Sequence, residues 1–262
     1  MRVDAINRPV ALPRLLVVQI RAVLLGYWRI PLFAIFTIGL PVMFFAFFGL
    51  PRLHQEMFRH VSVGAYILAS LGAYAVSNVL VYNVGIGQAQ TRARKLDLLQ
   101  RASPLPGWIA IAATMVGGLV LATSALVVLL LVGALAGVSL PPTHWLLLIL
   151  ALLYGAIPML GLGLTIGYLG SSGNLAPALA SLIYLPMAFA SGILIPLSQL
   201  PSLVRTIAPY LPLYQVGQLG WNAVGAANET ALHAALWTAV WALVLGGLAV
   251  YAYRRDQRRK FA

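Results

Sequence analysis

The side chains that could carry out covalent chemistry are few, and the clearest candidates lie in a short polar turn. Gly170-Ser171-Ser172-Gly173 matches a Gly-x-Ser-Gly pattern in which a serine can act as a nucleophile. Such a serine needs a general base within ~3 Å, and His233 is the candidate. The chain has no cysteine, which excludes a thiolate nucleophile and a Cys-based metal site. The other histidines form no metal-ligand cluster, so we expect no metal.

A second set of residues is polar but neutral, and it lies within a single apolar stretch. Its members follow one another at steps of three to four residues, which places them on one side of a helix. They are Ser70, Tyr74, Ser77, Asn78 and Tyr82. A polar stripe on a membrane helix faces protein or a cavity rather than lipid. Two interpretations are therefore open: a path for an amphipathic or uncharged substrate, and hydrogen bonding between helices.

Membrane helices have to position these residues, because the chain is too apolar for a soluble protein. It is 61% hydrophobic and 8% charged, whereas soluble domains carry roughly 25% charged residues. A bilayer core needs ~20 apolar residues per helix. The stretches that satisfy this are Ile30–Leu50, Val61–Asn83, Gly107–Gly137, Trp145–Leu169, Leu175–Leu197 and Ala231–Tyr253. The sequence thus predicts an all-α integral membrane protein with six transmembrane helices. Small residues four apart in the fourth stretch, such as Gly163 and Gly167, predict close helix packing.

The distribution of basic residues predicts the orientation. Fourteen of the 17 Lys and Arg residues lie before the first stretch, between the second and third, or after the sixth. Basic loops stay on the cytoplasmic side, so we expect both termini there. We expect a cytoplasmic interfacial segment over residues 1–29, a transmembrane domain over 30–253 and a basic tail over 254–262. The localisation expected is the cytoplasmic membrane of a bacterium or archaeon, with membrane lipids and no nucleic acid as partners.

Two further segments are neither spans nor ordinary loops. Residues 9–29 mix apolar residues with Arg14 and Arg21, which suits an amphipathic helix lying in the membrane interface, although a disordered tail is the alternative. Residues 198–230 are external, apolar and rich in proline and aromatic residues, which suits short re-entrant helices. The candidate residues of this external segment are Pro196, Pro201, Pro212 and Tyr214.

The energy source for any transport is not encoded in the predicted spans. They contain no Asp, Glu, Lys or Arg that could carry a coupling ion. A phosphate-binding loop needs Gly-Lys followed by Ser or Thr, and neither Lys95 nor Lys260 follows a glycine. A serine protease of the membrane is improbable. The predicted topology puts Ser172 in a cytoplasmic turn and His233 at the external end of its helix, so the two side chains would lie ~30 Å apart across the hydrocarbon. Hence we expect no catalytic residue and no cofactor in this chain.

The loop between the second and third stretches is charged yet contains leucines. Its candidate residues for docking on a soluble partner are Arg92, Arg94, Lys95, Leu96, Asp97, Leu98 and Leu99. With Ser103-Pro104, this run resembles the loop of permease subunits of ABC type-2 exporters. A second resemblance lies at the end of the fifth stretch and beyond, in Ser191, Gly192, Pro196, Leu200, Pro201, Pro212, Leu213 and Tyr214. The chain departs from the family pattern at Asp97, where Glu is usual, and at Arg92-Ala93-Arg94.

The resemblance implies a permease of an ATP-driven exporter for an amphipathic, lipid-like or drug-like substrate. It also implies two copies of an ABC ATPase subunit, which bind ATP and Mg, and a second permease copy in a homodimer. The loop around Leu96 would be the coupling helix. A passive channel or a membrane scaffold without an ATPase is the alternative.

Overall fold

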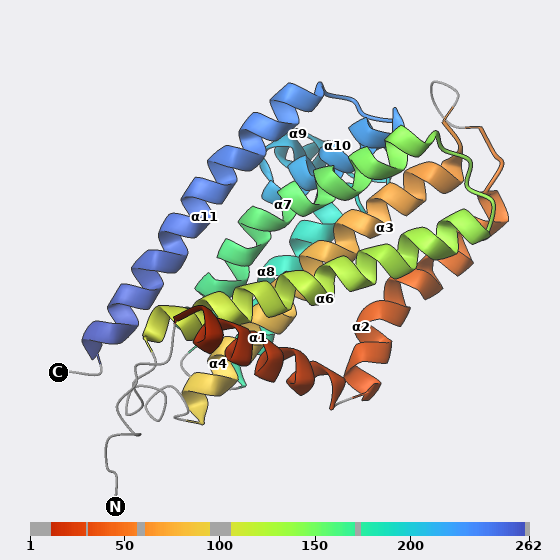
Figure 1. Cartoon of the computed structure of the whole chain (residues 1–262). Helices are drawn as coiled ribbons and strands as arrows, with labels where there is room; N and C mark the ends of the chain where they lie inside the picture. Colours follow the sequence, from red (N-terminus) through yellow and green to blue (C-terminus); the bar gives the residue numbers. More distant parts are fainter. Residues whose placement is uncertain (1–11, 30, 57–60, 95–105, 171–173, 260–262) are drawn as a thin grey trace, which may run out of the picture.

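The computed structural model describes residues 12–29, 31–56, 61–94, 106–170 and 174–259, and in these ranges the chain is helical. The one strand-like feature in the described ranges is an isolated bridge between Glu56 and Ser62. Figure 1 shows long helices lying side by side in an elongated bundle. The all-helical prediction is confirmed for the described residues.

The helices divide into long ones that run through the bundle and short ones near its ends. The long helices are α6 (Gly107–Leu135), α7 (Pro142–Leu169) and α11 (Ala231–Arg259), and the shorter helices α3 (Val63–Val79) and α8 (Leu175–Ala190) lie among them. Near the amino terminus lie α1 (Leu12–Trp28) and α2 (Pro31–Phe44), and α2 continues through the π-helical turn η1 (Phe45–Gly49) and the 3-10 turn η2 (Leu50–Arg52). Between α8 and α11 lie η5 (Leu197–Gln199), α9 (Ser202–Ile207), η6 (Ala208–Tyr210) and α10 (Pro212–Val224).

Four helices in the described ranges are long and apolar enough to cross a membrane. They are Val63–Ala93, Gly107–Leu135, Pro142–Leu169 and Ala231–Arg258. The other two predicted spans correspond to shorter apolar helices, Thr37–Arg52 and Leu175–Ala190. At ~1.5 Å per residue Leu175–Ala190 reaches about 24 Å, less than the ~30 Å of a hydrocarbon core, whereas the continuous helix from Pro31 to Arg52 reaches about 33 Å. The six-span topology therefore stays a prediction.

The second predicted span is longer than the sequence indicated. Its helix does not end at Asn83 but continues from α3 through the π-helical turn η4 (Leu80–Val84) into α4 (Gly85–Ala93). Polar residues fill α4, so hydropathy placed the boundary too early. Contacts with α7 stabilise the extension: a Cβ on Gly85 would lie 2.8 Å from the carbonyl oxygen of Gly163.

Glycines of α7 bring its backbone against two neighbouring helices. A Cβ on Gly161 would lie 2.8 Å from the backbone of Leu245 in α11, and one on Gly163 would lie 2.5 Å from the carbonyl oxygen of Leu80. A Cβ on Gly167 would lie 2.8 Å from the carbonyl oxygen of Gly85. The predicted close packing of this small-residue stripe is confirmed, since any side chain there would push the helices apart.

Segments rich in basic residues share one end of the bundle. The start of α1 and the ends of α4 and α11 lie together at the lower end in Figure 1. Helix α1 crosses α6, where Val23 fills the space above Gly117. Residues 12–28 are thus helical rather than a disordered tail, and Arg14 and Arg21 are exposed. The compartment that this end faces stays a prediction.

Candidate functional site

A cavity of about 530 Å³ opens between the end of α2, α3 and the segment that follows α8. Aromatic and aliphatic side chains form most of its wall, including Phe44, Phe48 and Phe189. Arg52, Ser70 and Gln199 are polar members of the lining. Ligand sites commonly measure about 300–1,000 Å³ and combine apolar walls with a few polar groups. The cavity therefore suits one small amphipathic molecule.

Ser70 is the member of the predicted polar stripe that lines this cavity. Its hydroxyl accepts a hydrogen bond from Trp221 Nε1 at 2.8 Å and donates one to the carbonyl of Tyr66 at 3.0 Å. The rings of Tyr66 and Trp221 stack with centroids 5.3 Å apart. Ser70 is thereby fixed in place by a buried contact between α3 and α10.

Two other members of the stripe, Tyr74 and Tyr82, contact α8 rather than the cavity. The Tyr82 hydroxyl donates to Ser181 Oγ at 3.2 Å, and the Tyr184 hydroxyl donates to the carbonyl oxygen of Tyr74 at 3.1 Å. Asn78 bonds within the stripe, donating to the Tyr74 hydroxyl at 3.4 Å. Ser77 is buried, and its hydroxyl finds no hydrogen-bond partner within the described ranges. Both interpretations of the stripe thus have residues that support them, Ser70 for a path and Tyr82 for packing.

At the other end of the same helix, Arg92 binds the carboxyl end of α7. Its Nη1 donates to the carbonyl oxygens of Gly167, Tyr168 and Gly170 at 2.8, 3.0 and 3.0 Å. The last carbonyls of a helix lack intrahelical donors and carry partial negative charge. A guanidinium at this position therefore supplies both hydrogen-bond donors and a compensating positive charge. The guanidinium also lies 5.5 Å from the centre of the Tyr168 ring.

Arg92 also forms an ion pair with Asp256 near the end of α11. The Arg92 and Asp256 side chains are 14% and 8% exposed. Two further contacts surround the pair: Gln88 donates to the Tyr168 hydroxyl at 3.0 Å, and the rings of Tyr168 and Tyr253 meet edge to face. Three helices, α4, α7 and α11, are joined at this point by polar groups from each.

The structure describes the predicted docking loop only at its start. Arg92 points into the bundle, whereas Arg94 is exposed and follows the last residue of α4. Lys95, Leu96, Asp97, Leu98 and Leu99 lie outside the described residues. Sequence reasoning did not identify Asp256, although an acidic residue among five basic ones in the tail was a visible signal.

The predicted external segment forms short helices that begin at prolines. Pro196 lines the cavity and precedes η5, Pro201 precedes α9, and Pro212 is the first residue of α10. Proline suits the first helical position because its missing N–H would have no partner there. Tyr214 is buried in α10, which packs against α3 and α7. Whether these helices re-enter a membrane stays a prediction.

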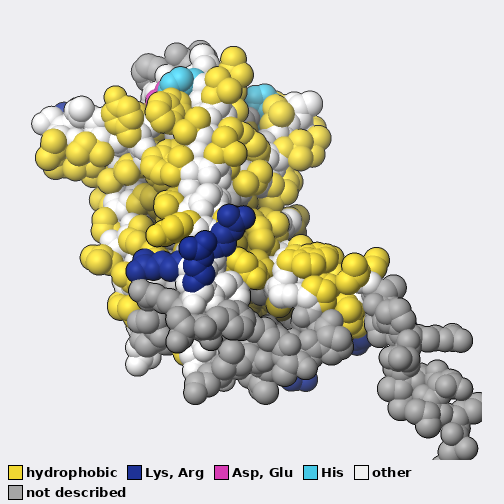
Figure 2. Space-filling view, turned by 90° about the vertical axis from the view of Figure 1, so that its left-hand side faces the viewer, with side chains coloured by type: hydrophobic (Ala, Val, Ile, Leu, Met, Phe, Trp, Pro, Cys, Tyr) yellow, Lys and Arg dark blue, Asp and Glu magenta, His cyan; other side chains and the backbone are white. Residues whose placement is uncertain are grey.

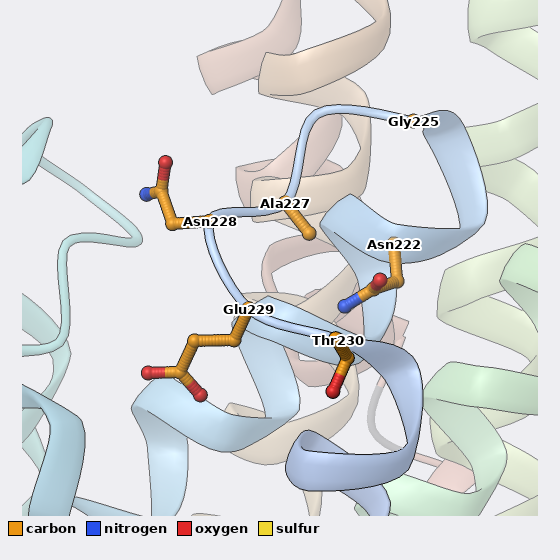
Figure 3. A pocket seen from close by; sticks show the side chains of 6 residues that line it. All are labelled: Asn222, Gly225, Ala227, Asn228, Glu229 and Thr230. Atoms are coloured by element: carbon orange, nitrogen blue, oxygen red, sulfur yellow. The ribbon is translucent and has the colours of Figure 1, made fainter.

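A polar pocket of about 350 Å³ lies between α10 and α11. Figure 3 shows Asn228 and Glu229 extending away from Asn222 and Thr230, which also line it. Glu229 accepts from His233 Nδ1 at 2.8 Å, and His233 Nε2 accepts from Trp237 at 3.1 Å. Sequence reasoning did not single out Glu229.

Tyr214 adds a buried phenol beside this group. Desolvation raises its pKa, and the carboxylate of Glu229 raises it further. The phenol is therefore neutral at physiological pH, so it offers a hydrogen-bonding group rather than a charge.

The remaining catalytic and metal hypotheses find no support. Ser172 lies outside the described residues, but the end of α7 just before it and the start of α11 at His233 lie at opposite ends of the bundle (Figure 1). His233 instead contacts Glu229 and Trp237. Within the described ranges, no group of three or more His, Asp or Glu residues is placed to hold a metal ion.

Comparisons with known proteins agree with the membrane architecture. The sequence model of the family described as ABC-2 type transporter matches residues 14–218, which include most of α1, the residues that line the cavity, and Arg92. The chain is also similar to the protein named "Putative transport permease YvfS" of Bacillus subtilis (strain 168). The two are 27% identical over 199 residues, which cover 76% of this chain and 80% of that protein.

Proposed function

This chain belongs to the ABC-2 type transporter family, and we propose that it is the membrane-spanning permease subunit of an ATP-driven exporter. It is a transport subunit rather than an enzyme, and it lies in a membrane. The name of its Bacillus subtilis relative, a transport permease, supports this assignment. The cytoplasmic membrane of a bacterium or archaeon is the proposed location.

One continuous helix carries the proposal. It runs from Val63 to Ala93, with Ser70 on the cavity wall and Arg92 at the start of the docking loop. At ~1.5 Å per residue these two residues lie about 33 Å apart along the axis. A force applied at the loop therefore reaches the cavity through one rigid element.

The proposed energy source is a separate ABC ATPase, present in two copies, that binds ATP and Mg. The sequence supports this division of labour because it contains no Gly-Lys-Ser or Gly-Lys-Thr run. The residues proposed to contact the ATPase are Arg94, Lys95, Leu96, Asp97, Leu98 and Leu99. Arg92 holds the base of this loop to α7 and α11, so displacement of the loop would move those helices as well.

The proposed substrate is an amphipathic, lipid-like or drug-like molecule. The cavity supports this class, because aromatic and aliphatic side chains form most of its wall while Arg52 and Gln199 offer hydrogen bonds. It lies beside α2 and α8, which contribute Phe44 and Phe189 to its lining. We propose that a second copy of the chain completes the path on this side, giving a homodimer.

Reconstitution of the full chain with its ATPase in phospholipid vesicles tests the proposal. We expect ATP hydrolysis by the ATPase to be stimulated by this chain and to require Mg. The double substitution Leu96→Asp/Leu98→Asp should abolish that stimulation, because charged side chains cannot occupy an apolar docking surface without desolvation. Leu135→Asp is the matched control, because Leu135 is 88% exposed at the opposite end of α6.

The same experiment separates the alternatives. Equal stimulation by wild type and by the Leu96→Asp/Leu98→Asp variant would refute the coupling role of the loop. Solute flux that persists without nucleotide, together with no association with an ATPase, would identify a passive channel. If neither solute flux nor association with an ATPase is observed, the result would identify a membrane scaffold.

A further inference from the structure

An apolar groove of about 310 Å³ lies on the outer surface where α6, α7 and α11 meet. It is separate from the cavity beside α2, and no residue lines both. Its wall consists of aliphatic side chains and glycine, with Tyr168 and Tyr253 as its hydroxyl-bearing residues. Along α11 it extends from Ala242 to Tyr253, about 16 Å at ~1.5 Å per residue.

Close backbone contact shapes one part of the groove, and aromatic rings shape another. Gly161 brings α7 onto the backbone of Leu245 and Gly246, which leaves no room for a side chain between the two helices there. Towards the carboxyl end of α11, the rings of Tyr168 and Tyr253 meet with centroids 5.4 Å apart. Gly246 also lines the groove, and a Cβ added to Gly246 would meet no atom within 4 Å.

One end of the groove has the composition of a membrane–water interface. Tyr253 reaches the start of α6, since its hydroxyl would lie 3.6 Å from a Cβ on Gly107. The next residue, Trp108, is 55% exposed. Tryptophan and tyrosine gather at the level of lipid headgroups. Tyr253 and Trp108 thus give this end of the groove the residue types typical of the headgroup level.

Basic side chains gather at this same end. Arg254, Arg255 and Arg258 directly follow the groove on α11, and all three are exposed. Arg254 lies one helical turn beyond Val250, a groove residue. Asp256, which lies among these arginines in the sequence, is itself buried and paired with Arg92. Figure 2 shows Lys and Arg side chains gathered next to the apolar surface on this side of the molecule.

We propose that this groove is a binding site for one anionic phospholipid of the surrounding bilayer. One acyl chain occupies the groove, and the phosphate of the headgroup lies at Arg254 and its neighbours. Charge complementarity selects an anionic lipid over a zwitterionic one, because a basic residue near an anionic surface contributes about 1 kcal/mol, equal to about fivefold in affinity. The site is distinct from the proposed substrate path and does not depend on transport.

Native mass spectrometry of the purified full chain tests the site with two probes. Phosphatidylglycerol and phosphatidylcholine with identical acyl chains are titrated separately. We expect one phosphatidylglycerol to be retained with at least about fivefold higher affinity than phosphatidylcholine. Gly246→Leu fills the open groove and should reduce retention of both lipids, whereas Arg254→Gln should reduce retention of phosphatidylglycerol alone.

Two matched controls accompany these variants. Gly247→Leu places the same side chain on the neighbouring residue, where there is also open space but no groove. Arg205→Gln removes one exposed charge from α9, far along the chain. Both controls should bind lipid like the wild type. Equal affinity for the two lipids would overturn the assignment, as would unchanged retention in Gly246→Leu.

Discussion

Replacement of Asp256 by asparagine tests the buried polar junction between α4, α7 and α11. Asn is nearly isosteric, so the main change is loss of the negative charge that pairs with Arg92. Removing one member of a buried ion pair costs about 3–5 kcal/mol. Arg92 keeps its three carbonyl acceptors on α7, so we expect a loss below this range, about 2–3 kcal/mol.

Thermal unfolding of the purified chain in detergent measures this loss. At about 2–4 °C per kcal/mol for a chain of this size, the midpoint should fall by roughly 4–12 °C. Glu56→Gln is the matched control, because Glu56 is an exposed carboxylate elsewhere in the chain. It should change the free energy of unfolding by less than about 0.5 kcal/mol.

A double-mutant cycle identifies the interaction itself. When Arg92 is replaced by Met, the Asp256 carboxylate has lost its guanidinium partner. Asp256→Asn should then cost less than about 1 kcal/mol, because contacting residues are not additive. An equal loss of stability in both backgrounds would refute the reasoning. If the proposed coupling is correct, Asp256→Asn should also lower the stimulation of ATP hydrolysis, which Glu56→Gln should not.

Two further predictions concern helix packing. Gly163→Ala should lower the thermal midpoint, because its methyl group would lie 2.5 Å from the carbonyl oxygen of Leu80, whereas Gly87→Ala meets no atom within 4 Å and should be neutral or stabilising. Tyr184→Phe removes a hydrogen bond between α8 and α3 and should cost about 0.5–1.5 kcal/mol, with no such loss for Tyr251→Phe, whose ring is exposed. Equal shifts in a variant and its control would contradict either prediction.

Local patterns in the sequence predicted much of the bundle. Hydropathy located the long helices, because each apolar run is about one bilayer in length. The spacing of Gly163 and Gly167 predicted a close helix contact, and both glycines lie against the backbone of another helix. The apolar, proline-rich character of residues 198–230 predicted short helices, and α9 and α10 lie in this segment.

Other features depend on contacts between distant residues and had no local signal. Arg92 and Asp256 are 164 residues apart, and only the fold brings them together. Arg92 was placed in a solvent-facing docking loop, because hydropathy assigns charged residues to solvent and cannot indicate a buried ion pair. The π-helical turn at Leu80–Val84 and the extension of the helix to Ala93 were missed for a similar reason, since backbone contact with α7 accompanies both.

The glycine contacts of α7 also have a mechanical consequence. Helices whose backbones touch cannot shear past one another without first separating, whereas side-chain layers permit small sliding motions. Helix α7, helix α11 and the segment η4–α4 therefore behave as a single frame. Helices α2 and α8 meet α3 through aromatic rings such as Phe44 and Tyr184, so relative displacement is expected there. Spin labels on α7 and α11 should keep a constant separation through a transport cycle, while labels on α2 and α8 should not.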